Sequence, residues 1–223
     1  MKVKAFLVIA GFIAILTSCG GGSPKGDDAT IQEKQETSEA TGTQFAVDTN
    51  TSTIRFIGYG VGKNHPGKFK ISSGTVALAN NQITGGSFTI DIKSMDLEQK
   101  GGIFDSKLRP HLMSGDFFDA DKFGTAKFEI TGVQPYTESG SDTSVVAGAN
   151  YMVSGNFTLK DVTKNISFPA KIDLDGNTLK AKSSFVIDRT QWQMRYGNDK
   201  TLGDKFISEK VDVELDLEAK KQR

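Results

Sequence analysis

Two histidines and one cysteine are the side chains of this chain best suited to catalysis or metal binding. A serine nucleophile would need His65 or His111 as its base, because no other histidine is present. The chain has no nucleophile elbow, no phosphate-binding glycine loop and no H-E-x-x-H pair. A zinc site would need carboxylates to complete it, because Cys19 is the only cysteine. We therefore predict no catalysis, metal or cofactor, and a small hydrolase built around one histidine remains the weaker alternative.

The N-terminus has the pattern of an export signal. Lys2 and Lys4 precede an apolar run, Ala5–Leu16, which would form only about 18 Å of helix and is too short to cross a bilayer core of about 30 Å. We predict a signal peptide over residues 1–18. The run ends in Leu16-Thr17-Ser18-Cys19, the pattern of a bacterial lipobox, which predicts a lipidated Cys19. The expected location is the bacterial cell envelope, with the protein anchored to a membrane through that acylated cysteine.

A disordered tether is expected over residues 19–44. This stretch is rich in Gly, Ser, Thr, Glu and Gln, and its one large apolar residue is Ile31. Such a composition buries too little apolar surface to offset the entropy of ordering. An exported domain without a second cysteine also has no intrachain disulfide, so its stability must come from its core.

From Phe45 onward the apolar residues alternate with polar ones. Phe88, Ile90 and Ile92 share one face of a strand, and Val211, Val213 and Leu215 share one face of another. Turn residues separate about eight such runs, with Asp175-Gly176-Asn177 the clearest hairpin turn. No long amphipathic helix is available to cover a sheet. The prediction is therefore an all-β fold, a single eight-stranded antiparallel β-barrel over residues 45–223.

One stretch, Gly101–Phe123, lacks the strand period. Phe104, Leu108 and Leu112 do not follow the alternation of a strand, and Pro110 suits a first helical turn. Short helical segments near residues 101–123 are predicted to plug or cover one end of the barrel.

Composition favours a large apolar interior and excludes a nucleic-acid partner. The chain has 15 Phe against 4 Tyr and 1 Trp, and phenylalanine carries no polar group into a core. Lys and Arg number 27, and so do Asp and Glu, whereas a nucleic-acid partner would require a basic surface.

Four segments in the barrel resemble one family. They read HLMSGDFFDADKFGTAKFEIT from His111, GNFTLKDVTKNISFPAKI from Gly155, FVIDRTQWQMRYGN from Phe185 and LGDKFISEKVDVELDLEA from Leu202. In this order they resemble the YceI-like family of lipocalin-like periplasmic proteins. The resemblance implies an extended antiparallel barrel that binds a polyisoprenoid or another long-chain amphiphile and performs no catalysis. Gly124 stands where the family usually has Pro, and Met113 where Lys is common, which leaves the head group of the ligand open.

The expected function is a membrane-tethered carrier or binding protein for a long-chain apolar lipid, such as a polyisoprenoid or a quinone precursor. The alternative is a structural or interaction lipoprotein with a side-chain-filled barrel and no ligand. The expected partners are this lipid, the membrane and, as an open possibility, a second copy of the chain. The predicted apolar lining consists of Phe56, Phe69, Phe88, Ile90, Ile92, Phe117, Phe128, Phe157, Leu159, Phe168, Phe185 and Trp192.

A polar mouth is predicted from Arg109, His111, Arg195 and Tyr196. Structural roles are the alternative for these residues. His111 would then fix the turn that runs to Phe118, and Asp188-Arg189 with Trp192 would form a corner at the end of a strand.

Overall fold

The computed structural model describes residues 22–37, 39–139 and 143–222. The predicted signal peptide and Cys19 lie outside these residues. Two short strands come first, β1 (Asp27–Asp28) and β2 (Thr30–Glu33). The other strands are β3 (Thr43–Val47), β4 (Thr53–Gly60), β5 (Lys63–Ala79), β6 (Gln82–Leu97), β7 (Thr125–Pro135), β8 (Tyr151–Leu159), β9 (Val162–Asp175), β10 (Thr178–Asp188) and β11 (Ile207–Lys221).

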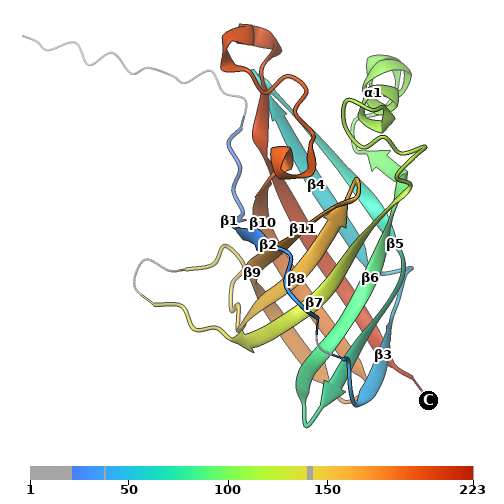
Figure 1. Cartoon of the computed structure of the whole chain (residues 1–223), viewed down its shortest axis with the longest axis vertical. Coiled ribbons are helices and arrows are strands. Elements are labelled where there is room, and N and C mark those ends of the chain that lie inside the picture. The colour runs from blue at the N-terminus through green and yellow to red at the C-terminus, as the bar shows by residue number, and fades with distance from the viewer. Residues whose placement is uncertain (1–21, 38, 140–142, 223) are drawn as a thin grey trace, which may run out of the picture.

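Strands β4 to β11 form a closed antiparallel barrel, as the alternation predicts (Figure 1). Each strand pairs with the next, and β11 closes the ring on β4 with Val213 opposite Phe56. Strand β3 pairs with β11 and β5 where β4 has not yet begun. The prediction of an all-β, eight-stranded barrel is confirmed. Closure pairs the edges that an open sheet would expose, apart from the seam between β9 and β10.

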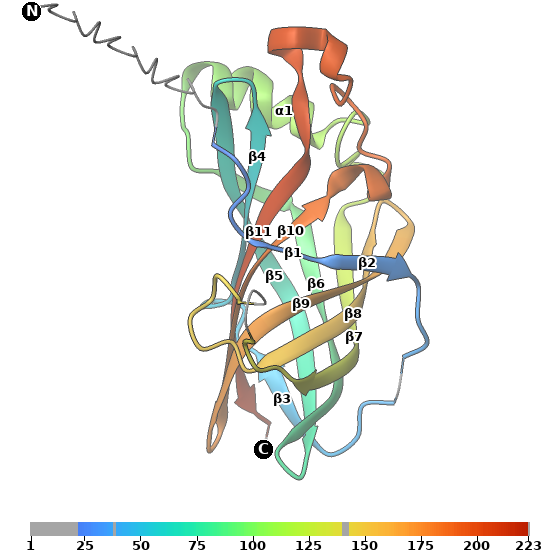
Figure 2. The ribbon, with the colours of Figure 1, turned by 90° about the vertical axis from the view of Figure 1, so that its left-hand side faces the viewer.

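One seam in this wall is incomplete. Strands β9 and β10 pair only where Lys171–Asp175 faces Thr178–Lys182, and beyond that point the two strands separate. The N-terminal strands occupy the free edges, β1 running parallel to β10 and β2 antiparallel to β9. Figure 2 shows this segment crossing the side of the barrel.

The prediction of a disordered tether over residues 19–44 is therefore wrong for residues 22–37. It is also wrong for Thr43 and Gln44, which begin β3. The segment has almost no apolar surface, but the free edges of β9 and β10 offer partners for its backbone. Ala29 and Ile31 also pack against the core. The barrel wall thus supplies the order that this composition cannot supply alone.

The two ends of the barrel differ. At the end that holds the β5–β6 and β9–β10 turns, buried side chains fill the interior, among them Phe45, Val76, Leu78 and Leu179. We call this the packed end. The opposite end carries the long connections between β6 and β7 and between β10 and β11 (Figure 1).

Short helical segments lie in those two connections. The β6–β7 connection contains η1 (Phe104–Leu108) and α1 (Arg109–Met113), with Pro110 in the first turn. This agrees with the short helices predicted near residues 101–123. The β10–β11 connection contains η2 (Arg189–Trp192) and η3 (Lys200–Lys205). Both connections lie over the end of the barrel opposite the packed end.

Candidate ligand-binding cavity

An apolar cavity of about 530 Å³ occupies the barrel beyond the packed end. Its size falls within the roughly 300–1,000 Å³ typical of small-molecule sites. All of the predicted apolar lining residues except Trp192 border it. The alternative prediction, a barrel filled by side chains along its whole length, therefore holds only at the packed end. That these residues bind a ligand remains a prediction.

The strand register places the aromatic lining in contact pairs. Phe88 on β6 lies directly opposite Phe128 on β7, and their rings stack with centroids 5.3 Å apart. Phe168 on β9 stacks on Phe185 on β10 at 4.0 Å, where these strands separate. Such pairs stabilise by about 0.5–1.5 kcal/mol beyond the burial of their area. The cavity wall is thus held by its own aromatic contacts.

A glycine makes room for one of these rings. Gly155 occupies an inward position on β8, and a Cβ atom there would lie only 2.2 Å from the Phe128 ring. The ring therefore lies against the backbone of β8. A side chain at residue 155 would push it into the cavity.

Polar lining residues are concentrated at the end away from the packed core. Lys63 and His65 come from the beginning of β5, His111 from α1, and Tyr196 and Lys205 from the β10–β11 connection. We call this end the mouth. The resulting arrangement, an apolar bore with a polar mouth, matches an amphiphile that has a long tail and a polar head.

His111 links the two connections at the mouth. Its Nε2 atom hydrogen-bonds the Asp116 carboxylate at 2.8 Å, which fixes the turn after α1. The His111 ring also contacts Tyr196 and Phe117, with centroids 4.6 and 5.2 Å away. Both roles considered for His111 therefore coexist, since it holds the turn and borders the cavity.

Arg189 forms the corner at the end of β10. It is buried and donates hydrogen bonds to the carbonyl oxygens of Ser208, Met194, Tyr196 and Ile207. Burial lowers the pKa of its guanidinium group from the usual range. Because backbone carbonyls use these donors, the structural interpretation of the Asp188-Arg189 corner fits this residue.

Three of the predicted site residues do not border the cavity. Trp192 is fully buried and donates its indole N–H to the Phe157 carbonyl, so it packs behind the lining. Arg109 donates to the Met95 and Lys93 carbonyls, which ties α1 to β6. Arg195 is exposed on the β10–β11 connection. Of the predicted mouth residues, only His111 and Tyr196 border the cavity.

Several bordering residues were missed by the sequence-based selection. Ile54, Ala126, Ile166 and Ile187 each share an inward strand face with a predicted residue, and Val211, Val213 and Leu215 form the inward face of β11, so the period of two contains their signal. Tyr59, Leu108, Phe118 and Met194 lie at strand ends or in connections. The period of two does not extend to these positions, so it does not predict that their side chains border the cavity.

Comparisons with known proteins agree with this architecture. The family model described as YceI-like domain matches residues 45–219. A UPF0312 protein of Ectopseudomonas mendocina is 30% identical over 118 residues, which span 53% of this chain and 51% of that protein. A UPF0312 protein of Vibrio vulnificus is 27% identical over 157 residues, 70% of this chain and 74% of that protein.

Solved structures share the fold. BcnA of Burkholderia cenocepacia superposes with a TM-score of 0.60 at 20% identity, over 77% of this chain and 98% of that one. A polyisoprenoid-binding domain from Saccharophagus degradans, implicated in plant cell wall breakdown, gives a TM-score of 0.57 at 14% identity. That match covers 80% of this chain and 98% of the domain.

Within the described residues, no helix combines the length and apolar character needed to span a bilayer.

Proposed function

Because this chain belongs to the YceI-like domain family, we propose that it is a cell-envelope lipoprotein that binds a long-chain amphiphile of the polyisoprenoid type. The observation that carries this proposal is the apolar cavity of about 530 Å³ with its polar mouth. The polyisoprenoid-binding domain of similar fold supports the ligand class. In this proposal the protein shields or carries the lipid and does not transform it.

The energetics of such binding rest on apolar contact. Each Å² of apolar surface removed from water contributes about 25 cal/mol, so burying about 300 Å² of a lipid tail would favour binding by roughly 7 kcal/mol before ordering costs. Phe88, Phe128 and Phe168 supply wide, rigid surfaces for this contact. The head group would lie among the mouth residues His65, His111 and Tyr196.

The lipid anchor is proposed from the Leu16–Cys19 pattern. Two or more acyl chains on Cys19 would hold the protein firmly, whereas one chain gives only marginal binding. Cys19→Ala tests this part. The variant should leave the membrane fraction and should incorporate no labelled fatty acid in a bacterial host. The unaltered chain should stay in the membrane fraction and incorporate the label.

Native mass spectrometry of the protein purified from a bacterial envelope tests the ligand. We expect a discrete added mass that organic extraction removes and whose lipid can be identified. A clean apo mass that persists after polyprenyl lipids are offered would overturn the binding proposal. The two parts are tested separately, because Cys19→Ala changes no residue that borders the cavity.

A further inference from the structure

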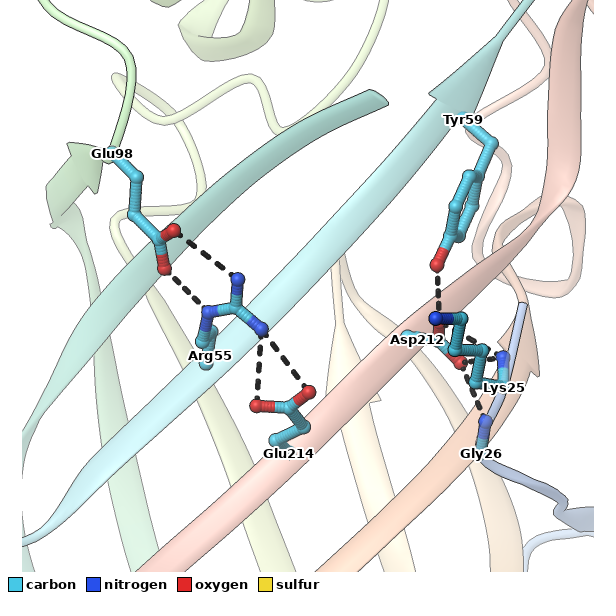
Figure 3. Close-up of polar contacts among 7 residues, drawn as sticks. All are labelled: Lys25, Gly26, Arg55, Tyr59, Glu98, Asp212 and Glu214. Carbon is cyan, nitrogen blue, oxygen red and sulfur yellow. Dashed lines mark hydrogen bonds and ion pairs between the residues drawn. The ribbon is translucent and has the colours of Figure 1, made fainter. Parts of the chain in front are cut away.

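The N-terminal segment is bonded to the outer wall of the barrel by two buried side chains. The amide groups of Lys25 and Gly26 donate to the Asp212 carboxylate at distances of 2.9–3.1 Å, and the Tyr59 hydroxyl donates to the same carboxylate (Figure 3). Farther along, Asn156 accepts from the amide of Gln35 and donates to its carbonyl. Asp212 and Asn156 lie on outward strand faces and are buried nonetheless.

This segment leads back to the mouth. A Cβ atom at Gly22 would lie 3.6 Å from the Tyr59 ring and 3.8 Å from the Asn64 amide, in the β4–β5 hairpin. Gly60 and Lys63 of that hairpin border the cavity. The first described residue therefore lies beside the cavity mouth and far from the packed end.

Sequence separation then limits where the anchor can be. Cys19 precedes Gly22 by three residues, a maximum reach of about 11 Å. Strand β5 runs from the mouth to the packed end over 17 residues, or about 56 Å. A membrane that holds Cys19 is therefore within reach of the mouth, and the packed end reaches it only if the segment leaves the wall.

Exposed apolar side chains occur at the tips of three connections at the mouth. Val61 is 50% exposed in the β4–β5 turn, Ile103 is 60% exposed before η1, and Leu202 is 43% exposed in η3. Figures 1 and 2 place these connections at one end of the barrel. The turns at the packed end carry Asn80-Asn81 and Gly176-Asn177 instead. Of the other exposed large apolar residues, Tyr196 is also at the mouth, Val145 lies in the β7–β8 connection, and Leu174, 38% exposed, is the one that lies at the packed end, beside the β9–β10 turn.

From these observations we propose that the bound N-terminal segment holds the cavity mouth against the membrane, with Val61, Ile103 and Leu202 in the bilayer surface. The inference rests on the proposed lipid anchor. Both charge signs occur on these tips, as Lys63, Lys107 and Lys200 show against Asp105, Asp199 and Asp204. Contact therefore depends on apolar insertion and only weakly on salt or anionic lipid. A lipid would pass between bilayer and cavity without crossing bulk water.

Hydrogen exchange on vesicles tests this orientation. Residues 19–223 are coupled through the Cys19 thiol to a maleimide lipid in phosphatidylcholine vesicles, and amide exchange is compared with that of the same chain, blocked at Cys19, in solution. We expect at least about fivefold slower exchange around residues 61–64, 102–107 and 200–204, and no change around 80–82 and 175–178. Equal protection at both ends, or protection at the packed end, would overturn the proposal.

Two variants separate the contributions of the segment and the tips. A 15-residue Gly-Ser insertion after Gly20 lengthens the tether and should remove most of the protection at the mouth. The triple change Val61→Ser, Ile103→Ser and Leu202→Ser should also remove most of the protection at the mouth, although the tether keeps its original length. Protection at the mouth that persists in each of these two variants would contradict the proposal.

The chemical coupling makes the result independent of natural acylation. Native mass spectrometry of the uncoupled chain, to which polyprenyl lipids are offered, reports lipid binding separately. A protein that binds no lipid but shows protection at the mouth would refute the proposed function and leave the orientation standing. A protein that binds lipid but shows no protection at the mouth would refute the orientation and leave the proposed function standing.

Discussion

His111 and Tyr196 meet edge to face at the mouth of the barrel, with ring centroids 4.6 Å apart and ring planes at 85°. His111 belongs to the β6–β7 connection and Tyr196 to the β10–β11 connection, so this contact joins the two covers of the cavity. Phe117 completes the cluster, 5.6 Å from Tyr196. The cavity is thus partly closed by a contact that joins the two connections, and we expect them to move apart if one ring is lost.

Tyr196→Ala should therefore accelerate the release of a bound lipid. An aromatic pair contributes about 0.5–1.5 kcal/mol, so we expect the dissociation rate of a fluorescent polyprenyl probe to rise roughly twofold to tenfold. Stopped-flow displacement by unlabelled lipid measures this rate. Arg195→Ala is the matched control, because Arg195 is exposed and does not border the cavity. Equal rates in both variants would show that this cluster does not limit release.

Filling the cavity should weaken lipid binding. Ala126 is buried on β7 and borders the cavity, so Ala126→Phe would put a ring in the space that a tail needs. We expect the affinity for the probe to fall by roughly an order of magnitude or more in a fluorescence titration. Lys127→Phe, on the outward face of the same strand, should bind normally. Circular dichroism and thermal melting check that both variants fold, and unchanged binding by a folded Ala126→Phe would place the ligand elsewhere.

Gly26→Ala should detach the N-terminal segment from the wall. A Cβ atom at residue 26 would lie 2.8 Å from the Phe185 backbone, which cannot move aside within β10. A loss of about 1.4 kcal/mol, the scale of one or two hydrogen bonds, would speed amide exchange of residues 27–33 about tenfold. Gly22→Ala is the control, because its Cβ would make only ordinary contacts of 3.6 and 3.8 Å. Unchanged exchange in Gly26→Ala would mean that these contacts do not hold the segment.

Alternation predicted the strands and most of the cavity lining because inward and outward positions follow directly from the pleat. Phe185, on β10, was predicted correctly to face the interior. Trp192, only seven residues later, lies beyond the strand in η2, where the period no longer tells which way a side chain points. Arg109 and Arg195 were misplaced for the same reason, since both lie in connections.

The order of the N-terminal segment had no signal in its own composition. Its partners are the free edges of β9 and β10 and the side chains of Asp212 and Asn156, more than 100 residues away. Asp212 and Asn156 both occupy polar positions of alternating strands, which predict exposure. The N-terminal segment covers Asp212 and Asn156 because β9 and β10 separate in three dimensions and leave free edges to which it binds.

A charge cluster outside the barrel predicts acid sensitivity. Arg55 on β4 binds Glu98 on one side and Glu214 on β11 on the other (Figure 3). Its hydrogen bond to Glu98 lowers the pKa of that carboxyl group, partly opposed by desolvation. A carboxyl group whose pKa is lower in the folded state stabilises the protein above its unfolded pKa, about 4.3. That stability is lost as the pH falls through the folded value.

Glu98→Gln should therefore lower the free energy of unfolding at pH 7, and the difference from the unaltered protein should disappear in strong acid. The effect should not exceed about 1 kcal/mol, because the pair is partly exposed. Urea denaturation at a series of pH values measures it. In an Arg55→Gln background the pH-dependent difference should vanish, and its persistence there would assign the effect to another partner.

Photo-crosslinking of a polyprenyl lipid that carries a diazirine in its tail tests whether such a lipid occupies the interior of the barrel. The full chain is loaded with the probe and irradiated, and the attachment sites are mapped by peptide mass spectrometry. We expect attachment to the inward residues of β6, β7 and β9, around Phe88, Phe128 and Phe168, and its loss in Ala126→Phe. Attachment confined to the outer wall, or unchanged in that variant, would contradict a lipid-binding cavity inside this barrel.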